Sequence, residues 1–128
     1  MIATGDKTKA LILFAHGARD PVWAEPFERL LAKIRLRAPG REVRLAFLEI
    51  MQPDLGDAVA DLVRQGATTI RILPIFFGQG GHLQRDLPAQ VEALRARHPG
   101  IEIDCAPPVG EDEAILEALT AYCVRYLT

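Results

Sequence analysis

The chain has 128 residues, of which 49% are hydrophobic and 25% are charged, and its formal net charge is −2. This length and balance are typical of one globular domain, and they exclude a disordered or fibrous chain. The positive charges form no basic stripe, so we expect no nucleic acid partner. The longest apolar runs are too short to cross a bilayer, so we expect no membrane partner. We predict a flexible N-terminal tail at residues 1–9 and a single α/β domain at residues 10–128.

The first half of the chain predicts two βα units. A nearly continuous apolar run at residues 10–15 predicts a strand, and apolar residues at helical spacing follow it. Pro26 fits only in the opening turn of that helix, which should end before Pro39. An alternating run at residues 42–48 predicts the second strand, and the helix after it should end at Gly66.

The second half predicts two more βα units. The third strand is expected at residues 69–74 and the fourth at residues 101–106. Between them we expect a helix that carries Pro88 in or near its first turn. Asp112 is a plausible N-cap for a fourth helix. The inward face of that helix is predicted to consist of Ile115, Leu116, Leu119, Cys123 and Tyr126.

Strand composition also predicts the order of the sheet. The first and third strands are nearly all apolar, as central parallel strands covered on both faces should be, whereas the second and fourth suit the edges. With right-handed crossovers, this predicts a three-layer α/β/α fold with a four-stranded parallel sheet in the flavodoxin-like order 2-1-3-4. The two cysteines, Cys105 and Cys123, form no disulfide framework. We expect both to be buried, in a cytoplasmic protein.

Three polar residues follow the first three strands at equal intervals along the chain: His16, Glu49 and His82. The carboxyl ends of parallel strands meet at one edge, where ligands bind in open α/β sheets, so we expect these side chains to face one cleft. Neutral imidazole suits a divalent ion such as Co²⁺, Fe²⁺ or Ni²⁺. His82 should lie near a helix N-terminus, where the macrodipole disfavours imidazolium. So few protein ligands suit a site that passes its metal on.

Each of these residues also has a purely structural interpretation. An isolated histidine at a strand end is usually a hydrogen-bonded surface or core residue. Glu49 is more weakly indicated, because a carboxylate after an edge strand is often only solvated. His98 looks like the end of a helix and is interpreted as structural.

The segment after the third strand could approach a ligand. Three glycines there allow close backbone approach, but without the Lys-Ser/Thr of a P-loop they are weak evidence for a phosphate ligand. Phe76 and Phe77 either wall an aromatic ligand or pack in the core. The glycines of this segment are Gly78, Gly80 and Gly81.

The motifs AHGARDP at residues 15–21, FLE at 47–49, LPIFFGQGGH at 73–82 and DLP at 86–88 together resemble the class II chelatases. The resemblance is to the small sirohydrochlorin cobaltochelatases and their ferrochelatase relatives, and it covers nearly the whole chain. The commoner family form of the first motif is Gly-His-Gly-Ser, so Ala15 and Ala18 are departures from it.

The resemblance implies insertion of Co²⁺ or Fe²⁺ into sirohydrochlorin, without ATP, on the way to cobalamin or sirohaem. His16 and His82 would bind the metal and accept the pyrrole protons, with Glu49 as an auxiliary acid. From their places beside the histidines, we infer that Arg19 and Arg85 pair with substrate carboxylates. Longer relatives look like two fused copies of this unit, which implies a homodimer with its clefts facing each other.

Two other functions are compatible with parts of the sequence. A strand followed by His-Gly also resembles the histidine phosphatases, but those carry arginine directly before the histidine, where this chain has Ala15. The other alternative is a non-catalytic carrier of metal or tetrapyrrole that uses the same cleft.

Overall fold

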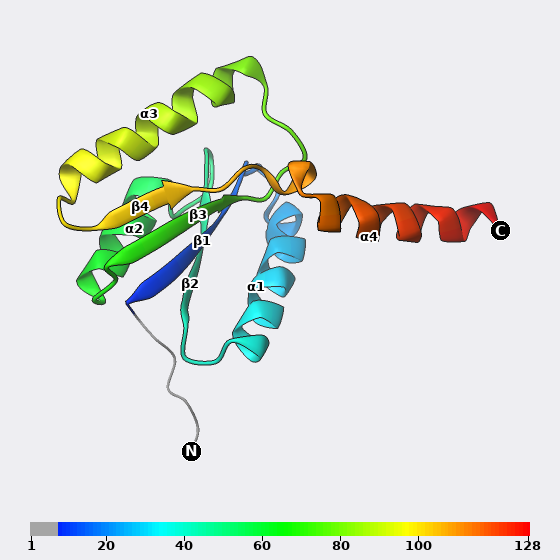
Figure 1. The fold of residues 1–128 in the computed structure, drawn as a ribbon, viewed down its shortest axis with the longest axis horizontal. Helices are drawn as coiled ribbons and strands as arrows, with labels where there is room; N and C mark the ends of the chain where they lie inside the picture. The colour runs from blue at the N-terminus through cyan, green and yellow to red at the C-terminus, as the bar shows by residue number, and fades with distance from the viewer. Residues whose placement is uncertain (1–7) are drawn as a thin grey trace.

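A four-stranded parallel sheet forms the centre of the fold in the computed structural model, which describes residues 8–128 (Figure 1). Its order, β2-β1-β3-β4, confirms the predicted topology. Two central strands pair along most of their length, with Ile12 opposite Ile72. The four strands are β1 (Lys9–Ala15), β2 (Glu42–Phe47), β3 (Thr69–Pro74) and β4 (Glu102–Cys105).

Four α-helices follow the strands, one after each, as the patterning predicted. Pro26 lies in the opening turn of the first helix, and Gly66, with φ of 101°, follows the second. The α-helices are α1 (Glu25–Arg37), α2 (Leu55–Arg64), α3 (Gly81–Arg97) and α4 (Glu113–Val124). Short 3₁₀ helices are η1 (Pro21–Ala24), η2 (Val109–Glu111) and η3 (Arg125–Leu127).

The main core lies between the sheet and helices α2 and α3. Each of these two helices buries four side chains, including Leu62 of α2 and Leu87 of α3. They pack on the strand residues that point to this face, such as Ile12 and Ile72. A smaller cluster joins α1 and η1 to Phe47 on the other face. The two clusters hold the carboxyl ends of the strands together as one rigid edge.

Replacing Leu62 with alanine should lower the free energy of unfolding by about 2–5 kcal/mol, because Leu62 is fully buried and its loss leaves a cavity. Urea denaturation followed by circular dichroism measures this change. Leu36→Ala is the matched control, since Leu36 is 83% exposed and its replacement should change stability by less than about 0.5 kcal/mol. Equal losses in the two variants would contradict this location of the core.

The structure differs from the predictions at Pro88 and at the two cysteines. Pro88 was expected in or near the first turn of its helix, but α3 begins at Gly81 and Pro88 lies in the helix interior. Pro88 is exposed, and its missing N–H removes one helical hydrogen bond on the solvent side of α3. Cys105 is only half-buried and Cys123 is exposed; neither is in a disulfide. Burial raises the pKa of the Cys105 thiol, and the carboxylate of Asp104 adds to the rise.

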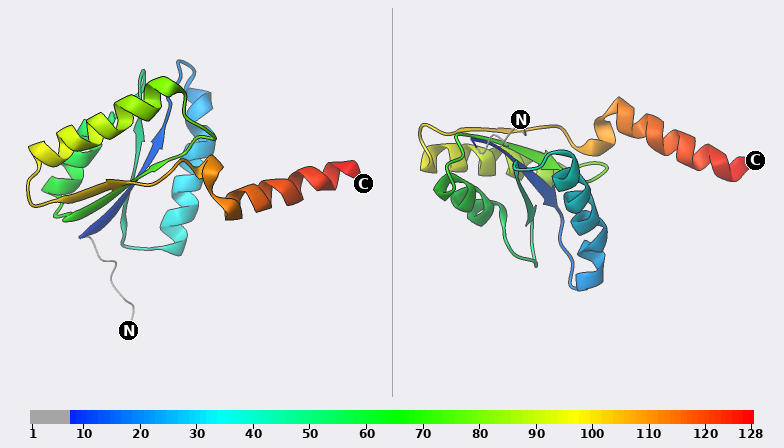
Figure 2. Two further views of the ribbon diagram at one scale, coloured as in Figure 1. Left: turned by 45° about the horizontal axis from the view of Figure 1, so that its top comes forward. Right: turned by 90° about the horizontal axis from the view of Figure 1, so that it is seen from below.

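Helix α4 also differs from the prediction, because its predicted inward face is not part of the core. Asp112 caps the helix as predicted, accepting hydrogen bonds from the N–H groups of Ala114 and Ile115. No residue of α4 is buried, and the helix extends away from the sheet in every view (Figures 1 and 2). An apolar stripe shows that a helix has a face to bury but not which surface covers it.

The ends of the chain and the strand limits differ slightly from the predictions. The tail predicted at residues 1–9 lies almost entirely outside the described residues, and Lys9 already belongs to β1. Strand β2 ends one residue earlier than predicted, and β4 is one residue shorter at each end. Within the described part of the chain, no helix is both long and apolar enough to span a membrane.

Candidate functional site

His16 is the first residue after β1, at the carboxyl edge of the sheet. Its side chain is exposed, and its ring lies 4.7 Å from the ring of Phe76, centroid to centroid. Phe76 is 9% exposed, and its ring also lies edge to face with that of Phe14 of β1, 6.5 Å away between centroids. The imidazole of His16 therefore rests on the aromatic part of the core while its edge remains open to solvent. A buried ring beneath it limits the orientations that the imidazole can adopt.

The segment after β2 is joined directly to the segment after β1. The N–H of Glu49 donates to the carbonyl of His16 at 3.1 Å, and the N–H of Leu48 donates to the carbonyl of Ala15 at 2.8 Å. A Cβ atom on Gly17 would lie 2.0 Å from the carbonyl oxygen of Glu49, and Gly17 has φ of 94°. Only glycine fits this contact, which explains the glycine after His16.

A tight turn continues this segment beyond Glu49. The N–H of Met51 donates to the carbonyl of Glu49 at 2.7 Å, and Ile50 between them has φ of 71°. A β-branched residue in this region of backbone space is strained, and such strain is concentrated at functional positions. Sequence patterning did not single out Ile50, because nothing in its residue type indicates a left-handed conformation.

His82 is the second residue of α3. Its side chain is 91% exposed, and its Nε2 atom lies 3.7 Å from Oδ2 of Asp86, one turn along the helix. A carboxylate at this distance can stabilise the positive charge of an imidazole that has taken up a proton. The prediction that His82 lies at a helix N-terminus is confirmed.

The glycine-rich segment leaves open space beside His82. A Cβ atom added to Gly78, Gly80 or Gly81 would meet nothing within 4 Å. Gly80 is the N-cap of α3, so the N–H groups of the first helical turn have no capping side chain. These glycines leave the approach to the start of α3 unobstructed.

The two phenylalanines of this segment differ: one packs in the core, and the other is exposed where a ligand could contact it. Phe76 packs in the core, whereas Phe77 is 65% exposed. Gly110 of η2 donates to the carbonyl of Phe76, and a Cβ atom on Gly110 would lie 1.8 Å from the carbonyl oxygen of Phe77. Phe77 is therefore the ring available to a flat ligand, while Phe76 supports His16.

Both arginines that were inferred to pair with substrate carboxylates are exposed. Each lies near one of the two histidines in the sequence. Arg19 follows His16 by three residues, and Arg85 lies in the opening turns of α3. The Nε atom of Arg85 donates to the carbonyl of Gly81 at 3.3 Å, a bond that a stronger carboxylate acceptor can replace.

A three-ligand metal site is not formed among residues 8–128 of one chain. In residues 8–128, no three or more histidine, cysteine, aspartate or glutamate side chains group so that they could hold a metal ion. His16 and Glu49 are joined through their backbones, and their side chains do not form such a group with His82. Two imidazoles and a carboxylate were expected to face one cleft. The described residues do not bring them together as a three-ligand group, and the role of each residue remains a prediction.

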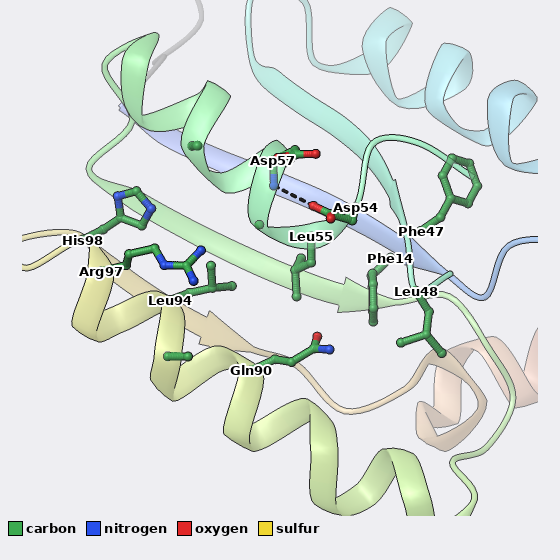
Figure 3. A pocket seen from close by; sticks show the side chains of 13 residues that line it. Phe14, Phe47, Leu48, Asp54, Leu55, Asp57, Gln90, Leu94, Arg97 and His98 are labelled. Atoms are coloured by element: carbon green, nitrogen blue, oxygen red, sulfur yellow. Dashed lines mark hydrogen bonds between the residues drawn. The ribbon is translucent and has the colours of Figure 1, made fainter. Parts of the chain in front are cut away.

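A separate cavity of about 430 Å³ lies between α2 and α3 (Figure 3). Leu48, Asp57, Gln90 and His98 are among its lining residues, and none of the predicted site residues lines it. His98 is the C-cap of α3 and its N–H donates to the carbonyl of Leu94, as expected of a structural residue. This cavity is distinct from the rim that carries His16 and Glu49.

Comparison with known proteins gives a consistent result. The CbiX family model matches residues 10–124. Sirohydrochlorin cobaltochelatase of Sulfurisphaera tokodaii is 32% identical over 112 residues, which cover 85% of this chain and 86% of the relative. Sirohydrochlorin ferrochelatase of Bacillus subtilis is 26% identical over 113 residues, which cover 87% of this chain and 42% of the relative.

Solved structures agree with the fold. A putative cobalamin biosynthesis CbiX protein from Marinobacter aquaeolei aligns with a TM-score of 0.81 at 31% identity, covering 93% of this chain and 97% of that one. The sirohydrochlorin chelatase SirB from Bacillus subtilis subspecies spizizenii, in complex with cobalt, aligns with a TM-score of 0.73 at 27% identity, covering 89% and 49%. The phosphatase and carrier alternatives gain no support from these comparisons. The family model spans nearly all of the described chain, and the fold agrees with it, so this chain belongs to the CbiX family.

Proposed function

We propose that this protein is a metal chelatase that inserts Co²⁺ or Fe²⁺ into sirohydrochlorin. The observation that carries the proposal is the match of the CbiX model to residues 10–124, together with relatives named sirohydrochlorin cobaltochelatase and ferrochelatase. The site supports the same reaction, because exposed imidazoles follow β1 and begin α3 at one edge of the sheet. The cytoplasmic setting is part of the proposal, and the two free cysteines are compatible with it.

The chemistry requires both a metal ligand and a base. When a divalent metal enters the macrocycle, it forms bonds to the pyrrole nitrogens, and two N–H protons leave. In the proposal, His16 and His82 hold the incoming ion through imidazole nitrogen and accept these protons as the ion leaves them. Asp86, 3.7 Å from His82, can stabilise the imidazolium that results. The metal is thus a substrate that is bound in passing.

Substrate binding is assigned to the surface around these histidines. Sirohydrochlorin is a flat macrocycle with many carboxylates, so it needs an aromatic or open surface and several cations. Phe77 offers an exposed ring, and the space over Gly78, Gly80 and Gly81 is open. Arg19 and Arg85 are the proposed partners of the carboxylates. Glu49 is the proposed auxiliary acid.

A homodimer is also part of the proposal. The matched region makes up 42% of the Bacillus subtilis ferrochelatase, which leaves room in that protein for a second unit of this size. Two copies with their rims facing each other would enclose a macrocycle that one open rim cannot. The high exposure of His82 in one chain is in keeping with a site that needs a second wall.

The test is a spectral assay of metal insertion. Purified protein with sirohydrochlorin and Co²⁺ should shift the absorption spectrum of the macrocycle faster than the same mixture without protein. Parallel reactions with Fe²⁺ and Ni²⁺ rank the metals by initial rate. The same rate with and without protein would contradict the proposal, and tight binding of sirohydrochlorin without acceleration would identify a carrier instead.

A further inference from the structure

The segment between β2 and α2 is anchored on both faces of the sheet and carries an exposed isoleucine between its anchors. Leu48 packs against the main core beneath α2 and α3, and Met51 packs against the smaller cluster on the other face. The N–H of Phe47 donates to the carbonyl of Pro53 at 2.9 Å, which closes the segment at its base. Ile50 lies between these anchors and is 61% exposed. The fold therefore presents the side chain of Ile50 to solvent at a fixed place.

The backbone at Ile50 is in the left-handed region, with φ of 71°. A β-branched side chain is unfavourable there, and glycine or asparagine adopts this conformation much more readily. Burial does not account for the isoleucine, because most of its side chain is exposed. A strained residue that well-anchored neighbours hold at an exposed position indicates a role in binding.

Ile50 and Phe77 occupy corresponding places on the two sides of His16. In the sheet order, β1 lies between β2 and β3, so the segment after β1 is flanked by the segments after β2 and β3. The N–H of Glu49 donates to the carbonyl of His16, and Ile50 is the next residue. The ring of Phe76 packs on the imidazole, and Phe77, 65% exposed, is the next residue. Each exposed apolar side chain thus directly follows a residue that contacts His16.

We infer that Ile50 is a binding residue for the macrocycle, whose flat face rests on Ile50 at one side of the imidazole and on Phe77 at the other. The inference rests on the proposed function, because it takes sirohydrochlorin as the ligand. The ring face is the apolar part of this ligand, and its carboxylates lie at the periphery, within the range of arginine side chains. A wide ring supported on both sides of His16 cannot tilt away from it, so the pyrrole nitrogens stay within reach of the imidazole.

The strain at Ile50 is useful in this arrangement. Because the segment is fixed before the ligand arrives, the contact orders little additional chain when the ligand binds. A more flexible loop with a residue suited to the left-handed region would present less apolar surface at the same place. The fold therefore trades some stability for a preformed contact.

Titration of the full chain with sirohydrochlorin, without metal and followed by the absorbance of the macrocycle, tests the contact. Ile50→Asn should raise the Kd by about tenfold, because it replaces much of one apolar contact with a polar side chain. In the insertion assay with Co²⁺, KM should rise by a similar factor while kcat stays within about twofold of wild type, because the ring face is bound equally before and during insertion. A Kd equal to that of wild type would overturn the inference.

Thermal unfolding separates this role from a merely structural one. Ile50→Asn should unfold at a temperature no lower than wild type, because asparagine relieves the strain of the left-handed backbone. Ile50→Leu keeps an apolar side chain and should bind sirohydrochlorin within about twofold of wild type. If Ile50→Leu binds as weakly as Ile50→Asn, an apolar contact at this position is ruled out.

Leu36→Asn is the matched control for the loss of an exposed apolar side chain. Leu36 is 83% exposed, and its neighbour Arg35 donates to the carbonyl of Val43 near the start of β2, at the opposite edge of the sheet. This variant should leave the Kd for sirohydrochlorin unchanged. A rise equal to that in Ile50→Asn would show a general effect of surface polarity and would contradict the inference.

Two further measurements exclude indirect effects of Ile50→Asn. Its effect on the Kd should be the same at low and high salt, whereas an effect that acts through displaced arginines would shrink as salt screens their charge. Light scattering after gel filtration should give the same mass for Ile50→Asn as for wild type. A lower mass would assign Ile50 to an interface between copies, and that result, like a strong salt dependence, would overturn the inference.

The binding and insertion assays together separate this inference from the proposed function. Binding of sirohydrochlorin that depends on Ile50, in a protein that does not accelerate insertion, would remove the chelatase and leave the contact. Normal binding and KM in Ile50→Asn, in a protein that accelerates insertion, would remove the contact and leave the chelatase.

Discussion

Replacing either His16 or His82 with alanine should reduce the protein-dependent rate of metal insertion by about 100-fold or more. Each change removes a metal ligand and a proton acceptor together. Initial rates from the absorbance of sirohydrochlorin, with Co²⁺ and with Fe²⁺, measure this loss. Both side chains are exposed, so the fold should be preserved, which circular dichroism and thermal unfolding check. His16→Ala also removes the imidazole that packs on the ring of Phe76, so it should lower the free energy of unfolding somewhat.

The control for these variants is His98→Ala. His98 is the third histidine of the chain, and it lies at the C-cap of α3 beside the separate cavity between α2 and α3. Its replacement should leave the insertion rate within about twofold of wild type, since general acid–base assistance depends on contact with the reacting group. Full activity in His16→Ala or His82→Ala would remove that residue from the mechanism while leaving the chelatase proposal open to other ligands.

Gly17→Ala should be the most destabilising single change near the site. The new methyl group would lie 2.0 Å from the carbonyl oxygen of Glu49, and the backbone at φ of 94° disfavours any side chain. Strain and clash together should lower the free energy of unfolding by about 3–5 kcal/mol, a large part of the total stability of a domain. Whatever protein stays folded should have displaced segments after β1 and β2, and the insertion rate should fall with them.

Gly66→Ala separates strain from contact. Gly66 has φ of 101°, close to that of Gly17, but an added Cβ meets nothing within 4 Å. This variant should therefore lose only about 1–2 kcal/mol, the cost of the backbone conformation. Urea denaturation of both variants gives the difference, which reports the contact between Gly17 and Glu49. Equal losses in the two would mean that the close approach in this structure does not exist in solution.

The strand order could be predicted from the sequence because strands buried on both faces are more apolar than edge strands. Central strands covered on both faces are expected to be largely apolar, and the runs in β1 and β3 are nearly continuous apart from Lys9, Thr69 and Arg71. The positions of His16 and His82 followed from the same logic, since each residue comes after a central strand or its loop. Asp112 could be assigned as a cap because its preference acts through bonds to nearby N–H groups, and these are formed.

Features that depend on distant partners could not be read in this way. Phe76 and Phe77 are adjacent and identical in type, yet Phe76 packs against the rings of Phe14 and His16 and is 9% exposed, whereas Phe77 is 65% exposed. The need for glycine at position 17 arises from a carbonyl group 32 residues away in the chain. Residue type alone does not indicate that a carbonyl group from a distant part of the chain lies so close.

The amino-acid sequence by itself determined the α/β class, the 2-1-3-4 order and the histidines at the edge of the sheet, because periodicity and burial are local properties of each segment. Only the tertiary structure decided that α4 projects from the domain and that one sheet face is left partly uncovered. The physical reason is that an apolar helix face specifies a need for burial, whereas the path of the preceding segment, held by Pro108 and Gly110, determines which surface can meet it.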